Sequence, residues 1–297
     1  MLRPRQARRW ASHIIEECVL SSRIVTHGGG PHMDDLISVC MVLAMNDDIK
    51  YVERRPVKPE EIADPAVWVL DQGGVHDPEN RNFDHHQFPA GTRKCTLSLI
   101  ADHFDLKNDL DETVWFRALV LDDTLGAIKT ARELDCSATL LKGLLNGPVN
   151  KFVLARFEQA KKLDSDNELV KLLSAIGTHI VTNIRNMKER LQLIREKAEF
   201  DEVNGMKVLF FMEDVPDPKL SIAAYIKETG KNTGVVVVAN TRESGWSLGR
   251  VGDHPRVDFR RIKGADGVIF VHANGFVAKT RRIEKPAIIR LLETAIE

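Results

Sequence analysis

The chain has 297 residues, of which 43% are hydrophobic and 29% charged, with a net charge of −1. This composition indicates a soluble globular protein long enough for two domains, and the charge balance argues against binding polyanions over the whole surface. No apolar run approaches the roughly 18 residues of a membrane-spanning helix, so no membrane partner is expected. Four cysteines without CxxC spacing argue against a zinc site and favour a reducing, cytoplasmic compartment.

Residues 1–11 are rich in arginine and contain no acidic residue, which is typical of a mitochondrial transit peptide. Apolar residues then recur at helical spacing between Ile14 and Val19, and two glutamates interrupt the basic character. We therefore expect a surface helix that opens the fold, with a mitochondrial location as the alternative.

Strands and helices are predicted to alternate in the first half of the chain. The apolar pattern predicts strands at 23–26, 49–52 and 66–70, and helices at 36–45, 96–104, 110–121, 134–145 and 149–163. This alternation indicates an α/β fold with a doubly wound parallel sheet, in which ligands gather at the carboxyl ends of the strands. His27 and Asp71 each follow a predicted strand, so we expect both at the same edge.

The second half of the chain begins with a long amphipathic run over residues 168–200, which predicts a connecting helix. Beyond it the pattern predicts strands at 207–211, 234–239, 247–251, 268–271 and 276–278, and helices at 221–227 and 284–296. We therefore expect a catalytic domain at 1–165, a helical connector at 166–204 and a smaller mixed α/β, substrate-binding domain at 205–297.

Three expected loops carry a concentration of imidazole and carboxylate side chains. They are His27, His32, Asp34, Asp71, Asp84, His85 and His86. This ligand set, which contains no thiolate, suits Mn²⁺, Mg²⁺ or a related divalent ion. Two ions held by bridging carboxylates can bind a phosphoryl group and generate a hydroxide nucleophile.

Asp34 and Asp35 also precede the helix expected at 36–45, where a carboxylate can cap free N–H groups. Capping is therefore an alternative role for either residue. One cap needs one carboxylate, so two in a row, together with His32, leave a surplus.

The order of these motifs resembles the DHH phosphoesterase superfamily, which includes RecJ-type exonucleases, nanoRNases and family II inorganic pyrophosphatases. Within it, the chain is most similar to the melanocyte-proliferating-gene exonuclease family. The similar stretches are Thr-His-Gly-Gly-Gly-Pro-His-Met-Asp-Asp at 26–35, Val-Leu-Asp-Gln-Gly-Gly at 69–74, Phe-Asp-His-His-Gln at 83–87 and the segment 267–276. The likeness is dense from His27 to Gln87 and sparse between 129 and 200.

The resemblance implies two divalent metal ions, Mn²⁺ first and Mg²⁺ as the alternative. His27, His32 and Asp71 would hold one ion, and Asp34, Asp71, His85 and Asp123 would hold the second, with Asp71 bridging. The stretch Asp-Asp-Thr-Leu at 122–125 is similar to Ser-Asp-Thr-Leu in the pyrophosphatase branch, which favours Asp123 over Asp122 as the ligand. The alternative is that both residues cap a helix end.

The same resemblance implies that His86 faces the substrate, where it would polarise a phosphoryl oxygen or transfer a proton. Asp84 would then orient an imidazole through its other ring nitrogen.

Residues 242–290 contain eleven lysines and arginines against five aspartates and glutamates. Local basicity of this kind is typical of a surface that binds a phosphate backbone, and scattered solvated charge is the alternative. Within this stretch, Arg250, His272 and Asn274 are candidate substrate contacts.

The first functional hypothesis is a metal-dependent phosphodiesterase, an exonuclease acting on RNA or short oligonucleotides through in-line attack by a metal-bound hydroxide. An inorganic pyrophosphatase or small-nucleotide phosphohydrolase is the second. A non-catalytic binding protein with a decayed site is the third. The sequence leaves a homodimer open.

Overall fold

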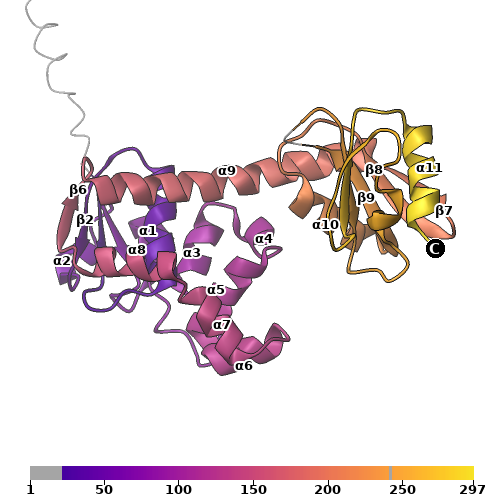
Figure 1. The fold of residues 1–297 in the computed structure, drawn as a ribbon. Coiled ribbons are helices and arrows are strands. Elements are labelled where there is room, and N and C mark those ends of the chain that lie inside the picture. Colours follow the sequence, from indigo (N-terminus) through magenta and orange to yellow (C-terminus); the bar gives the residue numbers. More distant parts are fainter. Residues whose placement is uncertain (1–21, 241–242) are drawn as a thin grey trace, which may run out of the picture. The chain divides into compact units, whose positions relative to one another are not determined.

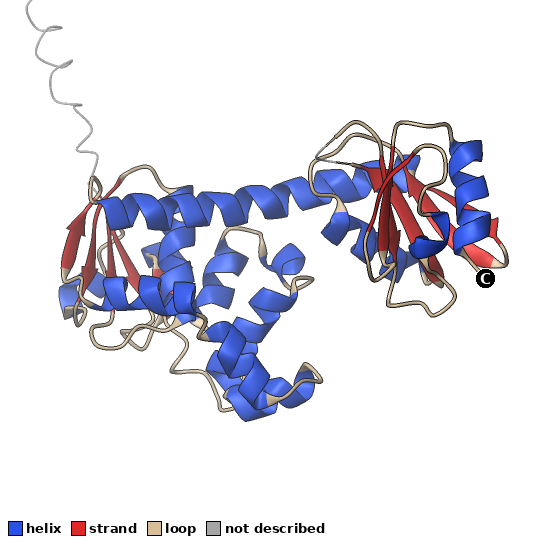
Figure 2. Cartoon of the chain, viewed as in Figure 1, coloured by secondary structure: helices blue, strands red, loops and turns tan. Residues whose placement is uncertain are grey.

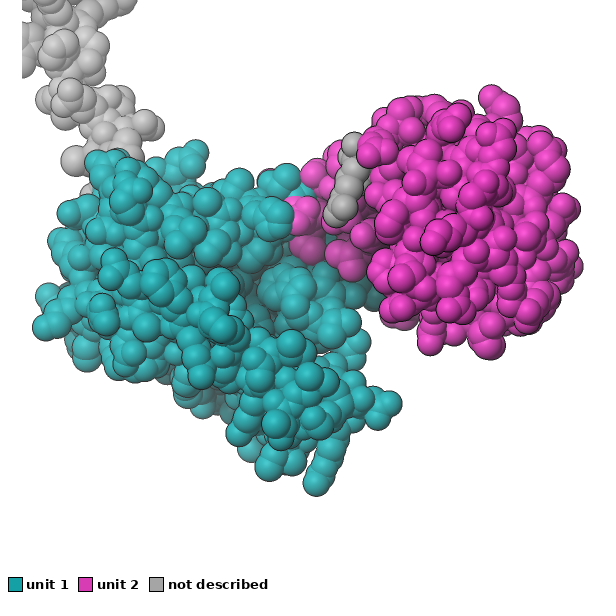
Figure 3. All heavy atoms as spheres, viewed as in Figure 1, with its two compact units in different colours: residues 1–182 teal, residues 183–297 magenta. Residues whose placement is uncertain are grey.

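The computed structural model describes residues 22–240 and 243–297. The N-terminal surface helix expected from the sequence lies outside these residues. Contacts within the chain divide it into two compact units, residues 1–182 and 183–297 (Figure 3). Each unit contains a six-stranded sheet, drawn as red arrows in Figure 2.

The sheet of the first unit has the strand order β4-β5-β3-β1-β2-β6. Its strands are β1 (Ser22–Thr26), β2 (Ile49–Arg54), β3 (Val67–Leu70), β4 (His76–Asp77), β5 (Asn82–Phe83) and β6 (Lys162–Asp164). The four central strands run parallel, whereas β4 and β6 pair antiparallel with their neighbours at the two edges. The predicted parallel sheet is therefore confirmed in its centre, and two antiparallel edge strands add to it.

The register of this sheet brings three strand ends together. Thr26 of β1 pairs with Leu70 of β3, and Leu70 pairs with Phe83 of β5. The residues that come next in the chain are His27, Asp71 and Asp84. All three consequently leave the sheet at the same carboxyl edge, which is where doubly wound folds bind their ligands.

Helical segments cover both faces of this sheet. On one face, Val67 and Val69 of β3 pack with Val57, which precedes α2 (Pro59–Ile62). On the other face, the Trp68 ring stacks on Phe83 and contacts the ring of Phe104 at the end of α3. Successive strand residues point to opposite faces, so burial on both sides explains the uninterrupted apolar sequence of β3.

The first unit is otherwise helical. Its further helices are α1 (Met33–Met45), α3 (Thr96–His103), α4 (Lys107–Leu110), α5 (Val114–Leu125), α6 (Ala127–Glu133), α7 (Ala138–Leu145) and α8 (Pro148–Glu158), and α9 (Glu168–Lys197) continues past residue 182 (Figure 1). Cys40 and its neighbours in α1 are fully buried. A Cβ added to Gly177 of α9 would overlap the carbonyl oxygen of Cys40, so glycine permits the close contact of these two helices.

Among the described residues, the second unit combines a mixed sheet with the last part of α9 and two further α-helices. Its strands are β7 (Glu199–Val203), β8 (Met206–Phe211), β9 (Thr233–Ala239), β10 (Trp246–Arg250), β11 (Val268–Val271) and β12 (Val277–Thr280), in the order β11-β12-β10-β9-β8-β7, and the two further helices are α10 (Lys219–Thr229) and α11 (Lys285–Ala295). The pair β8–β9 is parallel and the other pairs are antiparallel. Val208, Phe210, Leu248 and Leu292 belong to its buried core. The predicted mixed α/β region is confirmed.

Several predicted boundaries are wrong. The helix expected at 110–121 is two helices, α4 and α5, and the second extends to Leu125. The helix expected at 134–145 begins only at 138, where the Ser137 side chain caps α7. The helices expected to reach residues 163 and 200 end earlier, and the strands β6 and β7 follow them. β6 forms by pairing with β2, and β7 forms by pairing with β8. A local sequence pattern cannot reveal such partners.

Among the residues that the structure describes, every helix is too short or too polar to cross a lipid bilayer, α9 included.

Candidate metal centre

The Asp71 carboxylate stands between two histidines at the carboxyl end of β3. Its Oδ2 atom lies 3.4 Å from Nε2 of His27, and its Oδ1 atom lies 3.1 Å from Nε2 of His85. Oδ1 also accepts a hydrogen bond of 3.0 Å from the hydroxyl of Thr96. The backbone of Asp71 is left-handed, with φ of 55°, which costs roughly 1 kcal/mol in a non-glycine residue. This turn places the carboxylate between the two imidazoles, and aspartate is among the few non-glycine residues that adopt the conformation readily.

The loop between β1 and α1 is tied to the body of the unit. Its middle residue Gly29 has φ of 86°, a conformation that favours glycine. The buried Arg54 side chain donates one hydrogen bond to the carbonyl oxygen of Gly29, at 3.0 Å, and another to that of Phe157, at 3.2 Å. Its guanidinium group also lies over the Phe157 ring. These contacts fix the loop that carries His27 and His32.

Two aspartates lie in the first turn of α1, where free N–H groups and the helix dipole favour carboxylates. Asp35 Oδ1 accepts a hydrogen bond of 3.0 Å from the backbone N–H of His32, and Asp35 Oδ2 lies 3.1 Å from Nε2 of His27. The contact with the Asp35 carboxylate, to which the protonated ring of His27 donates from Nε2, is the main reason that the pKa of His27 rises to about 9. Asp35 therefore acts as the helix cap and also faces the candidate centre.

Asp34 is the surplus carboxylate. Its side chain is buried, and within the described residues neither of its oxygens has a hydrogen-bond partner. Burial raises the pKa of Asp34 well above its usual range, and the nearby charges of Asp123, Asp71 and Asp35 raise it further. Buried carboxylates that repel one another need a compensating positive charge. A divalent cation fits this donor set of imidazole nitrogens and carboxylate oxygens.

Asp123 lies in the last turn of α5, not beyond the helix end as the sequence pattern suggested. The helix ends at Leu125 and is followed by Gly126, which has φ of 75°. Asp123 Oδ2 lies 3.5 Å from Nε2 of His85, and Asp123 rather than Asp122 belongs to a group with His32 and Asp34. Burial raises the pKa of Asp123, as it does for Asp34.

The Asp-His-His triplet is organised by Asp84. Asp84 Oδ1 accepts hydrogen bonds from the backbone N–H groups of His85 and His86, at 2.7 and 3.1 Å, and lies 2.7 Å from Nδ1 of His86. Asp84 Oδ2 accepts a bond of 2.6 Å from the N–H of Gly74. Burial alone would raise the pKa of Asp84, but the hydrogen bonds from His86 and Gly74 lower it below its usual range. Asp84 is therefore ionised and sets the orientation of His86.

The two histidines of the triplet differ in exposure. The His85 side chain is 14% exposed and the His86 side chain 64% exposed. Burial alone would lower the pKa of His85, but the carboxylates of Asp71 and Asp123 raise it. His85 thus points into the carboxylate cluster, whereas His86 is open to a ligand.

Three groups of side chains have ligand atoms that all lie within 4.8 Å of one another. The groups are His27, Asp35 and Asp71; His32, Asp34 and Asp123; and Asp71, His85 and His86. All six sequence-predicted metal ligands occur in these groups. The grouping differs from the one that the resemblance implies, because Asp35 rather than His32 stands with His27 and Asp71. Sequence reasoning also missed Thr96 and Arg54, whose roles depend on contacts distant in the chain.

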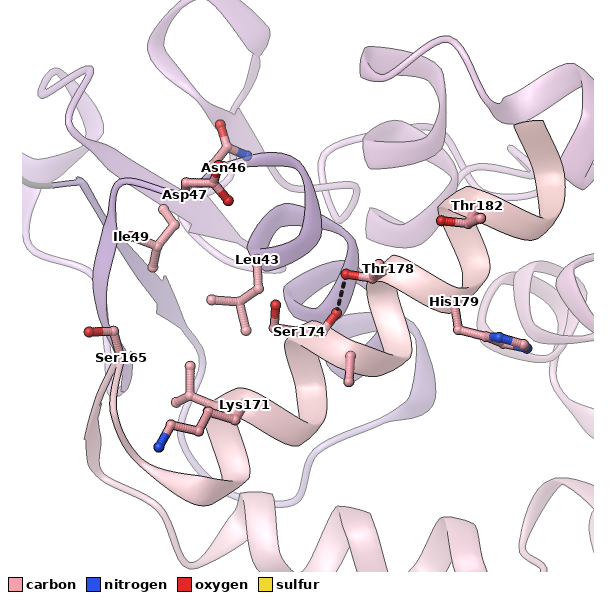
Figure 4. A pocket seen from close by; sticks show the side chains of 12 residues that line it. Leu43, Asn46, Asp47, Ile49, Ser165, Lys171, Ser174, Thr178, His179 and Thr182 are labelled. Atoms are coloured by element: carbon pink, nitrogen blue, oxygen red, sulfur yellow. Dashed lines mark hydrogen bonds between the residues drawn. The ribbon is translucent and has the colours of Figure 1, made fainter. Parts of the chain in front are cut away.

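A groove with a volume of about 700 Å³ lies at the opposite edge of the same sheet (Figure 4). Leu43, Ile49, Lys171 and Thr178 are among the residues that line it. Ile49 pairs with Ser22, the first residue of β1, so the groove lies at the amino edge and not at the carboxyl edge. None of the residues in the three ligand groups lines the groove. The chemistry of the unit is therefore concentrated at the other edge.

The three candidate substrate contacts belong to the second unit. Arg250 donates a hydrogen bond of 3.0 Å to the carbonyl oxygen of Val257 and pairs with Asp253. His272 Nδ1 accepts a bond of 3.1 Å from the N–H of Asn274, an exposed residue between β11 and β12. These contacts stabilise two turns, and contact with a substrate stays a prediction.

A mostly parallel sheet thus carries imidazoles and carboxylates at its carboxyl edge, among them an Asp-His-His triplet. These are the features that the resemblance to the DHH phosphoesterases implies.

A comparison with protein families identifies the same relationship. The model of MYG1_exonuc, described as an uncharacterised protein family (UPF0160), matches residues 23–97. The matched segment contains the loop from His27 to Asp35, Asp71 and the triplet Asp84-His85-His86. The resemblance predicted from the sequence is therefore confirmed over this segment. No curated protein matches the chain.

Solved structures with a detectable likeness include RecJ in complex with Mn²⁺ from Thermus thermophilus, at 13% identity and a TM-score of 0.30. That comparison covers 99% of this chain and 55% of the RecJ chain, so this chain spans little more than half of RecJ. A candidate family II inorganic pyrophosphatase from Methanococcus jannaschii matches at 16% identity and a TM-score of 0.23, with 92% of this chain and 99% of that chain covered.

Proposed function

We propose that the chain is a phosphoesterase that holds two divalent cations and hydrolyses phosphodiester bonds in RNA or short oligonucleotides. The observation that carries the proposal is the position of Asp71, whose two oxygens lie 3.4 Å from His27 and 3.1 Å from His85. A carboxylate that faces two imidazoles with different oxygens can bridge two ions.

The proposed ligands share one property, which is a side-chain atom directed into the cluster. They are His27, His32, Asp34, Asp71, His85 and Asp123. Mn²⁺ accepts a mixed imidazole and carboxylate set more readily than Mg²⁺, which prefers oxygen ligands. When bound, the ions would neutralise phosphoryl charge and lower the pKa of water at the site. The oxygens of Asp34, which lack a hydrogen-bond partner in the described part of the chain, support this requirement for cations.

His86 is the proposed catalytic histidine, and Asp84 its positioning residue. An ionised carboxylate can only accept a hydrogen bond, so Nδ1 of His86 carries the proton in its 2.7 Å contact with Asp84. Nε2 of this exposed ring is then available to a phosphoryl oxygen or a leaving group. A histidine held in this way can transfer a proton during hydrolysis.

The basic stretch at 242–290 supports a phosphate-rich substrate. Within it, Arg250, His272 and Asn274 are the proposed contacts. This assignment concerns the second unit by itself.

The test is a substrate panel for the full chain with Mn²⁺ or Mg²⁺. We expect ion-dependent release of nucleotides from labelled short RNA. Hydrolysis of pyrophosphate without cleavage of oligonucleotides would replace the proposal with the pyrophosphatase alternative. A protein that binds the ions but cleaves no phosphoester would contradict it.

The variant His86→Ala probes the proposed catalytic histidine. Removal of a positioned acid–base group lowers kcat by about 10²–10⁴-fold. Both Mn²⁺ ions should still bind, since Nδ1 of His86, the atom nearest to Asp71, is engaged by Asp84. His179→Ala, which removes an exposed histidine from α9, is the matched control and should retain full activity.

A further inference from the structure

Asp35 occupies an unexpected position for a residue that caps a helix. Its side chain is fully buried, with Oδ1 bonded to the N–H of His32. Its second oxygen, Oδ2, lies 3.1 Å from Nε2 of His27, closer than the Asp71 oxygen at 3.4 Å. One imidazole nitrogen therefore faces two carboxylate oxygens from different parts of the chain.

The hydrogen bond made by the other ring nitrogen of His27, Nδ1, determines whether Nε2 presents a proton or a lone pair in the neutral ring. Nδ1 lies 2.8 Å from the carbonyl oxygen of Gly28, and because a carbonyl can only accept, Nδ1 must donate. In the neutral imidazole, Nε2 then presents its lone pair to the oxygens of Asp35 and Asp71. Nε2 and the two carboxylate oxygens need a positive charge among them, which a proton on Nε2 supplies in the protonated ring and a metal cation supplies once it is bound. Fixing one histidine nitrogen to a backbone carbonyl also leaves the other nitrogen as a metal ligand.

His32 is less suited to this position. It is exposed, whereas Asp35 is fully buried, and the centroids of the His27 and His32 rings are 6.3 Å apart. The ligand atom of His32 groups instead with Asp34 and Asp123. The Asp34 oxygens are buried and have no hydrogen-bond partner within 22–240 and 243–297, so this second group also needs a cation.

We infer that Asp35 is a metal ligand, which forms one cation site with His27 and Asp71, while His32 serves the other ion with Asp34 and Asp123. The inference rests on the proposed function, which assigned ligands without Asp35. Asp35 then has two simultaneous roles, because Oδ1 closes the first turn of α1 and Oδ2 binds the ion. The cap thereby fixes the distance between a metal ligand and the loop that carries His27.

The variant Asp35→Asn separates these roles. The amide oxygen of asparagine can still accept from the N–H of His32, while the amide NH₂ group replaces the ligand oxygen. Binding of Mn²⁺ by the full chain is counted by electron paramagnetic resonance of the free ion and by calorimetry. We expect Asp35→Asn to lose one of two bound ions, or to bind it at least about tenfold more weakly. The variant should still fold without metal, because the cap of α1 is kept.

Asp64→Asn is the matched control, since Asp64 Oδ1 accepts from the backbone N–H of Ala66, at 2.9 Å, outside the three ligand groups. This variant should bind both ions like the wild type. An Asp35→Asn protein that also binds both ions with wild-type affinity would show that Asp35 is only a cap and would overturn the inference. A wild type that binds no divalent ion would overturn the proposed function together with it.

A double-mutant cycle keeps the inference testable if Asp35→Asn unfolds more easily. Losses in Mn²⁺ affinity should be non-additive between Asp35→Asn and His27→Asn, which affect the same ion. They should be additive between Asp35→Asn and His32→Asn. The reverse result would return His32 to the site of His27 and contradict the assignment.

Discussion

The carboxyl edge of the first sheet and the second unit arrange their charged side chains in opposite ways. At the carboxyl edge of the first sheet, Asp34, Asp35, Asp71 and Asp123 lie together, and Asp34 lacks a hydrogen-bond partner among the described residues. In the second unit, basic side chains pair with nearby carboxylates. These pairs are Arg250 with Asp253, Arg260 with Asp258, Arg261 with Glu297, and Lys285 with Glu199 and Asp201. Crowded carboxylates reduce stability, so their retention in the first unit points to a functional requirement.

The largest effect is expected from Asp71→Asn, which affects both proposed ions. Asparagine tolerates the left-handed backbone of Asp71 and can keep the hydrogen bond from Thr96, so the fold should persist. One preorganised electrostatic contact is worth about 10²–10³-fold in kcat. We therefore expect turnover of short RNA to fall by at least that factor, together with loss of both bound ions. Near-normal turnover would contradict the bridging role.

Glu61 tests whether pairing with basic side chains, rather than burial, makes the difference between a stabilising and a destabilising carboxylate. This buried carboxylate in α2 accepts two hydrogen bonds from Arg55, one from Arg23 and one from the N–H of Lys58. The hydrogen bonds from Arg55 are the main reason that its pKa is lowered from 4.5 to about 2. Replacement by Gln should reduce the free energy of unfolding by about 1.5–3 kcal/mol at neutral pH.

The pH dependence of this difference follows from the lowered pKa of Glu61. Its stabilising contribution is complete above the ordinary value of 4.5 and is lost as the pH falls towards 2. Urea unfolding of wild type and Glu61→Gln should therefore converge in acid. A gap that stays constant down to about pH 2 would show that the charge of Glu61 is not responsible.

In the absence of metal, Asp34→Asn should raise the free energy of unfolding, whereas Glu61→Gln lowers it. The raised pKa of Asp34 means that its ionised form is disfavoured in the folded protein, so at neutral pH the charge reduces stability. A neutral amide should raise the free energy of unfolding by about 0.5–2 kcal/mol in chelator. Thermal unfolding with and without Mn²⁺ measures this gain and the expected loss of metal stabilisation. A destabilised metal-free variant would contradict the account of the cluster.

The smallest effect is expected from Lys285→Met in the second unit. Lys285 lies 2.9 Å from Asp201 and over the ring of Phe210, and methionine keeps apolar contact with that ring. Partly exposed ion pairs contribute about 0.2–1 kcal/mol, and salt screens them. The loss in unfolding free energy should thus disappear in high salt, and divalent ions should have no specific effect on it.

The sequence predicted the parallel centre of the first sheet because β1 and β3 are apolar runs that end at His27 and Asp71. It could not predict β5, since a strand of two residues, Asn82–Phe83, has no periodicity and exists through its pairing with β3. That missed strand is what places Asp84 beside Asp71. The sequence therefore predicted that the triplet meets the other ligands only from the order of the motifs, and not from this strand.

The local sequence also could not assign the two aspartates of α1. A doublet before an apolar run indicates a cap and a surplus carboxylate, but not which is which. Among the described residues, the structure assigns the cap to Asp35 and leaves the Asp34 side chain without a hydrogen-bond partner. It also places an oxygen of Asp35 against His27, a contact that depends on how the glycine loop folds back.

Gly177 lies on α9, a helix that supplies none of the proposed metal ligands, and contacts α1, which carries Asp34 and Asp35. α1 carries Asp34 and Asp35 in its first turn and is touched further along by Gly177 at Cys40. Even a methyl group at position 177 would overlap the backbone of α1, and any shift of α1 that relieved this overlap would move its leading carboxylates. Such a variant would resemble a ligand mutant in a metal titration while every ligand remained intact. Screens for inactivating substitutions should therefore include this helix crossing as well as the residues that face the cations.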